Sequence, residues 1–153
     1  MAGSGSSNSS SVAIISSSLR AVDIHNNGAV VQLDSNNRVD DGWSRANNVF
    51  KYSGETNYVE IVININAVDS GSSNYWSRPK LRVLKDGDIL GVIDDLVMQQ
   101  NGAYDGDATY ADILIDEIIS TDPVYTFEWF DKETRTSTLV PEDYSKIVLK
   151  AFS

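Results

Sequence analysis

The chain has 153 residues, 41% of them hydrophobic, which suits one folded domain with a sizeable core. It contains no cysteine, so a disulfide framework and a thiolate metal site are excluded. Twelve Lys and Arg against 22 Asp and Glu give a net charge of −10, which makes nucleic acids and anionic membranes poor partners. We also expect no signal peptide and no membrane span, because no apolar run approaches the roughly 20 residues needed.

The N-terminal segment is rich in Ser, Gly and Asn and has no side chain able to build a core over residues 1–11. Because such a segment cannot order itself, we expect a partner to hold it. We therefore divide the chain into an extended arm, residues 1–18, and a β-domain, residues 19–153. Strand addition to a coat protein is expected at residues 12–15. The predicted anchoring residues are Ser4, Ser6, Asn8, Ser10, Val12, Ile14 and Ile15.

The first half of the chain contains short β-branched runs separated by polar turns. Asn27-Gly28 is a preferred pair for a tight hairpin turn. Residues 34–48 are polar, so we expect a loop or a broken edge strand there. The clearest strand is 58–66, because apolar residues alternate with polar ones. Its predicted buried face consists of Val59, Ile61, Ile63 and Ile65. The expected shorter strands are residues 12–15, 19–24, 29–33 and 49–52.

The second half continues the same pattern. Asp86-Gly87 predicts a hairpin between the strands 80–85 and 88–92. The segment 110–119 alternates, with Asp112 and Asp116 on the outer face. We place on the other, inner face Ala111, Ile113, Ile115 and Ile119. Two further alternating strands are expected at 124–130 and 146–152. About ten strands and no helix predict an all-β antiparallel sandwich of jelly-roll type with an extended N-terminal arm.

The order and character of the last strands resemble those of the tumour-necrosis-factor/C1q-type jelly roll. The resemblance covers about residues 29–153 and rests on the isoleucine strand 59–65, the strand 110–119, the aromatic strand 124–130 and the terminal strand 146–152. It implies a compact homotrimer, and domains of this type also occur in bacteriophage head decoration and fibre proteins. On the trimer interpretation, Tyr125 and Phe152 are the expected axial contacts.

The sequence offers no convincing catalytic or metal-binding constellation. The single histidine, His25, lies in a predicted turn and cannot build a multi-histidine site. Asp105-Gly106-Asp107 has part of a calcium-loop pattern but lacks the remaining ligand spacing. We expect no enzyme activity, no cofactor and no bound metal.

Aromatic residues in polar segments are the better functional signal, because such rings stack on sugars or form the centres of protein interfaces. Trp43, Tyr75 and Trp76 are the candidate ligand contacts. Each ring can equally close over the end of the sandwich. The aromatic face of 124–130 is expected to be core.

The leading hypothesis is a virion structural protein, made in the host cytoplasm and located on the outer capsid surface. It would decorate and stabilise a phage head as a trimer, anchored by its N-terminal arm to the major capsid protein or another virion protein. The alternative is a receptor- or carbohydrate-binding fibre tip that uses its loop aromatics.

Overall fold

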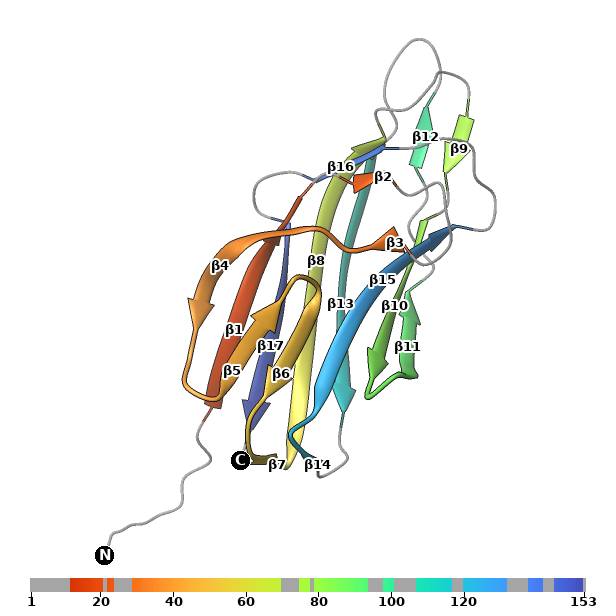
Figure 1. Cartoon of the computed structure of the whole chain (residues 1–153). Coiled ribbons are helices and arrows are strands. Elements are labelled where there is room, and N and C mark those ends of the chain that lie inside the picture. Colours follow the sequence, from red (N-terminus) through yellow and green to blue (C-terminus); the bar gives the residue numbers. More distant parts are fainter. Residues whose placement is uncertain are drawn as a thin grey trace, which may run out of the picture.

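A computed structural model gives the fold and describes residues 12–20, 22–23, 29–69, 75–77, 79–93, 98–100, 107–116, 120–131, 138–141 and 145–152. Every regular element in this part of the chain is a β-strand, and the paired strands are antiparallel. Two sheets form the body of the molecule (Figure 1). The expected all-β antiparallel architecture is confirmed.

The first sheet, called sheet A, is built around β8, the isoleucine strand. Hydrogen bonding gives the order β13–β8–β17–β1–β4. β16 pairs with β8 beyond the first residue of β17, and β2 pairs with β16. Its strands are β1 (Val12–Leu19), β2 (Val22–Asp23), β4 (Leu33–Val39), β8 (Tyr58–Asp69), β13 (Asp107–Asp116), β16 (Thr138–Pro141) and β17 (Lys146–Phe152).

The second sheet, called sheet B, has the order β5–β6–β15–β10–β11, with β3 paired to the far end of β15. Its strands are β3 (Ala29–Val30), β5 (Trp43–Ala46), β6 (Val49–Tyr52), β10 (Pro79–Lys85), β11 (Asp88–Ile93) and β15 (Val124–Asp131). Two short pairs complete the described strands: β7 (Glu55–Thr56) with β14 (Ser120–Thr121), and β9 (Tyr75–Ser77) with β12 (Met98–Gln100).

The core lies between the two sheets and follows the alternation of their strands. The four branched residues predicted for the inner face of β8 are fully buried, as are Phe127 and Trp129 of β15. Phe50 and Phe127 pack edge to face, with ring centroids 5.4 Å apart. Since alternate residues of a strand point to opposite faces, the buried side chains of both sheets interdigitate in one layer.

The segment 34–48 is more regular than its polar composition indicates. It forms β4 and β5, which join the two sheets through a tight turn at Asp41-Gly42. All six residues from Asp34 to Val39 are exposed, because β4 is an edge strand that completes its backbone hydrogen bonding with β1. Of the two alternatives, the broken edge strand is confirmed for β4, whose register with β1 shifts twice, and the loop is wrong. Pairing with a neighbouring strand outweighs weak β-propensity here.

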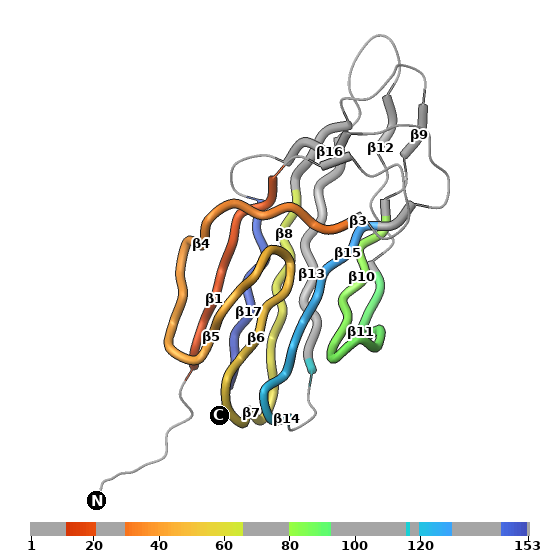
Figure 2. The backbone as a smooth tube through the Cα atoms, in the orientation of Figure 1, coloured from red at the N-terminus to blue at the C-terminus, as the bar shows by residue number. Residues whose placement is uncertain are grey.

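The domain boundary also differs from the predicted one. β1 lies between β17 and β4 in sheet A and pairs with both (Figure 2). Ile15 is fully buried, so residues 12–18 belong to the domain and not to the arm. The predicted strand addition at residues 12–15 has little free backbone to use, because β17 pairs with all four residues, Asp40 bonds to both backbone groups of Ile14, and β4 pairs from Ile15 onward. Residues 1–11 lie outside the described residues, as does the predicted Asn27-Gly28 turn.

The Asp86-Gly87 hairpin is confirmed. Both residues have positive φ, 50° and 88°, as a primed two-residue turn requires, and β10 and β11 pair across it. A second glycine with positive φ, Gly42, lies under the ring of Tyr52.

Gly42 and Gly87 lie in different turns and differ in what surrounds them, so together they test the packing of Tyr52 on Gly42. A Cβ at Gly42 would lie 2.7 Å from Tyr52 Cε1, whereas a Cβ at Gly87 meets no atom within 4 Å. Gly87→Ala should lower the free energy of unfolding by about 1–3 kcal/mol, since alanine is strained at positive φ. Gly42→Ala should lower it by about 1–3 kcal/mol more, because the Tyr52 ring must also move. Urea unfolding of both variants measures the difference, and equal losses would contradict the Tyr52 contact.

Candidate functional site

The outer face of sheet A carries an aromatic and apolar row at the end where β1 begins. Val12, Phe152 and Tyr58 occupy directly opposed positions on β1, β17 and β8. The rings of Tyr58 and Phe152 stack, with centroids 4.5 Å apart and planes inclined by 16°. Val12 is 40% exposed and Tyr58 38% exposed, so this row is accessible on the single chain.

The neighbouring rows extend this apolar surface across the sheet. Lys150 and Glu60 form an ion pair next to the aromatic stack. Val148 and Val62 are opposed in the row after that, and both are only partly buried. The backbone register places Ile113 opposite Val62. We call this surface, defined by Val12, Ile14, Tyr58, Val62, Val148 and Phe152, the sheet A face.

The sheet A face accounts for one of the two predicted trimer contacts and not for the other. Phe152 lies in it and is partly exposed. Tyr125 is fully buried between the sheets, on the inner side of β15. Its assignment to a subunit interface was wrong, because alternation along β15 turns Tyr125 toward the core together with Phe127 and Trp129.

Trp43 does not serve as an exposed ligand contact. Its side chain is 5% exposed, and its indole Nε1 donates a hydrogen bond to the carbonyl oxygen of Ala13, 2.8 Å away. The ring also meets Tyr52 edge to face at 5.1 Å. Trp43 thus closes the end of the sandwich and joins β5 to β1. Tyr75 and Trp76 form part of β9, but their side chains lie outside the described residues, so their ligand role stays a prediction.

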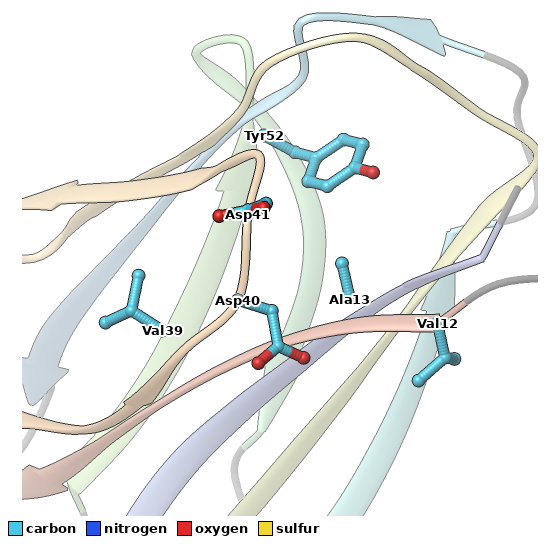
Figure 3. Close-up of a pocket in the computed structure, with 6 residues that line it drawn as sticks. All are labelled: Val12, Ala13, Val39, Asp40, Asp41 and Tyr52. Atoms are coloured by element: carbon cyan, nitrogen blue, oxygen red, sulfur yellow. The ribbon is translucent and has the colours of Figure 1, made fainter.

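A hollow of about 520 Å³ opens beside the first residues of β1 (Figure 3). Asp40, in the turn after β4, accepts hydrogen bonds from the Ile14 amide at 2.9 Å and from the Arg38 guanidinium. The Arg38 hydrogen bond, followed by the Ile14 amide, holds the pKa of Asp40 below its usual value. The lining residues are Val12, Ala13, Val39, Asp40, Asp41 and Tyr52.

A buried polar cluster lies at the opposite edge of the core, where β10 and β13 end. Asp116 is 2% exposed and sits between the sheets. Its Oδ2 accepts a hydrogen bond from the Tyr125 hydroxyl at 2.8 Å and lies 2.5 Å from Lys85 Nζ. Burial, followed by the bond to Asp116, raises the pKa of Tyr125, so its hydroxyl stays protonated and donates.

The sequence interpretation missed this cluster because it placed Asp116 on the solvent side. The register pairs Asp116 with Val59, a fully buried residue, and so turns the aspartate inward. Opposed residues of neighbouring strands share a face, so Asp116 lies on the buried side together with Val59. The predicted outward position of Asp116 was therefore wrong.

The described part of the chain contains no group of three His, Cys, Asp or Glu side chains able to hold a metal ion. Nor do the described residues include a helix long and apolar enough to cross a membrane. His25 and residues 105–106 lie outside the described residues, so the turn and calcium-loop interpretations stay untested.

The two sheets and their strand order define a jelly-roll sandwich of tumour-necrosis-factor type. No protein-family model and no curated protein matches the sequence. Among solved structures, murine APRIL at pH 5.0 is similar with a TM-score of 0.51 and 6% identity, covering 92% of this chain and 98% of that chain. Murine APRIL at pH 8.5 gives the same values. Eiger TNF from S. frugiperda gives a TM-score of 0.44 and 8% identity, covering 92% of this chain and 91% of that one. Identity this low shows the fold alone.

Proposed function

We propose that this chain is a non-enzymatic structural protein of a phage virion, which forms a homotrimer through the sheet A face and decorates the outer capsid surface. The observation that carries the self-association is the stacked Tyr58–Phe152 pair beside exposed Val12 on a sheet face. An exposed sheet face is ordinarily polar, and contiguous aromatic and apolar groups on it mark an interaction surface.

A second copy is the partner that this surface suits best. The surface is largely uncharged, and its ion pair, Lys150 with Glu60, is internally neutralised. Such a surface can be buried against a similar apolar surface, whereas it offers no opposite charge to a strongly basic or acidic partner. The resemblance to trimeric jelly rolls sets the expected number of subunits at three.

The N-terminal residues are the proposed capsid anchor. Residues 1–11 join β1 at Val12, at the edge of the sheet A face, so three arms of a trimer would leave from equivalent places. Trimerisation multiplies weak single-arm contacts through effective concentration. The earlier expectation that the arm reaches residue 18 is replaced by an anchor of residues 1–11, of which Ser4, Ser6, Asn8 and Ser10 remain candidate contacts.

Oligomeric state tests the first part of this proposal. Val12→Glu places a charge in the sheet A face, and Val92→Glu places the same charge on β11 of sheet B, at a valine of similar exposure, 45% against 40%. Sedimentation analysis should find a trimer for the wild type and for Val92→Glu, and dissociated subunits for Val12→Glu. A monomeric wild type, or equal effects of the two charges, would contradict the proposed interface.

Capsid binding tests the second part. Removing residues 2–11 leaves β1 intact, so the shortened protein should remain a folded trimer. We expect it to lose co-sedimentation with phage capsids that lack their decoration protein, while the full chain binds them. Undiminished binding by the shortened protein would contradict the anchoring role.

A further inference from the structure

Lys85 and Asp116 bring a primary amine and a carboxylate into contact between the two sheets. Lys85 is the last residue of β10 in sheet B, and Asp116 is the last residue of β13 in sheet A. Their side chains are 12% and 2% exposed, and Nζ lies 2.5 Å from Oδ2. These two strands do not pair with each other, so the side chains span the core from opposite layers.

We propose that Lys85 and Asp116 form an intramolecular amide bond that covalently joins sheet A to sheet B. The structure holds the two reacting groups side by side with a hydrogen-bond donor, Tyr125, on the same carboxylate oxygen. Held reactants of this kind react as if at very high concentration, with effective molarities of about 10⁵–10⁸ M for well-oriented groups.

The chemistry is a condensation and needs no oxidant or other co-reactant. A proton first moves from the Lys85 ammonium to the Asp116 carboxylate, which leaves a neutral amine and a neutral acid. The Nζ lone pair then attacks Cγ and forms a C–N bond. One carboxyl oxygen leaves as water with two hydrogens that Nζ carried as ammonium, and the amide remains.

Tyr125 is the positioning residue for this reaction. Its hydroxyl donates to Asp116 Oδ2, the oxygen in contact with Nζ, and so fixes the orientation of the carboxyl group against the amine. A reacting group held in one orientation adds faster than one that is free to turn. Tyr125 also lies directly opposite Lys85 in the pairing of β10 with β15, so the backbone register itself brings the donor and the amine together.

The amide would take the place that a disulfide has in proteins that contain cysteine. The chain has no cysteine, so its sheets cannot be joined by sulfur chemistry. An amide between the layers restricts the unfolded chain as a disulfide does, but it is insensitive to reducing agents. This proposal does not depend on the virion assignment.

Mass spectrometry of the denatured full chain tests the proposal. The wild type should be lighter than its sequence mass by one water molecule. Lys85→Arg, produced in the same way so that N-terminal processing cancels, should match its own sequence mass. Protease digestion of the wild type should yield one branched peptide that contains both Lys85 and Asp116. A folded wild type that keeps its full sequence mass after prolonged incubation, with both residues in separate linear peptides, would overturn the proposal.

Asp116→Asn and Tyr125→Phe sharpen the test. The asparagine variant should reach the same final mass as the wild type, because it loses ammonia where aspartate loses water. Tyr125→Phe should remain folded and form the amide more slowly, as followed by the mass of samples taken after refolding. An equal rate in Tyr125→Phe would overturn the positioning role of the hydroxyl.

Discussion

Replacing Asp116 with alanine should destabilise the domain by about 3–5 kcal/mol, because it leaves the Lys85 ammonium buried without its counter-charge. The Tyr125 hydroxyl also loses its acceptor inside the core. Loss of the proposed amide would add to this cost, since the variant cannot form it. Urea unfolding at a fixed subunit concentration measures the change.

A double variant separates the buried charge from the lost packing. Lys85→Met with Asp116→Leu removes both charges and keeps apolar side chains at the two sites. Replacing a buried ion pair by apolar residues of similar size is often neutral or stabilising, so the double variant should recover most of the loss that the unpaired charge causes. It cannot form the amide, so any part of the loss that comes from the amide should remain. If Asp116→Ala alone unfolds at nearly the wild-type urea concentration, the buried Lys85–Asp116 contact contributes little to stability and the expected loss is wrong.

Truncating Phe127 to alanine should cost about 3–5 kcal/mol, the range for removing a fully buried aromatic ring. Phe127 is 0% exposed and packs edge to face on Phe50, so the cavity would open in the centre of the sandwich. Its backbone carbonyl, which accepts a hydrogen bond from the Asn48 side chain, is unchanged by the substitution. The effect therefore reports ring packing, and thermal or urea unfolding measures it.

Phe152→Ala is the matched comparison for Phe127→Ala. The same ring is removed, but from the partly exposed outer side of sheet A, where it stacks on Tyr58. The subunit itself should lose less stability than in Phe127→Ala, while trimer formation weakens. The proposed interface would be contradicted by a Phe152→Ala protein whose association matches that of the wild type at every concentration.

The two variants together distinguish a core residue from an interface residue by different measurements. Phe127→Ala changes unfolding without a direct effect on subunit contacts. Phe152→Ala changes the dependence of assembly on concentration, because stability and association are linked when folded subunits associate. The contrast is visible in a single subunit. Phe127 is buried between the sheets, and Phe152 is partly exposed on the outer side of sheet A.

The sequence by itself determined the β-class of the protein and several of its strands. β8 and β17 alternate so regularly that their buried faces follow from period two alone. The Asp86-Gly87 turn was equally readable, because few residues accept positive φ at both central positions. These features depend on neighbours in the chain, so local patterns are sufficient to predict them.

Only the tertiary structure decided which strands pair and on which side of its strand Asp116 lies. Alternation in 110–119 defines two faces, but only the pairing of Asp116 with Val59 shows that this aspartate is buried. β1 becomes an inner strand of sheet A because β17, from the other end of the chain, pairs with one edge and β4 with the other. Trp43 is buried for the same reason, through its contact with Ala13 across the sandwich. Such contacts between distant segments determine the polar cluster and the sheet A face, and local sequence patterns do not contain them.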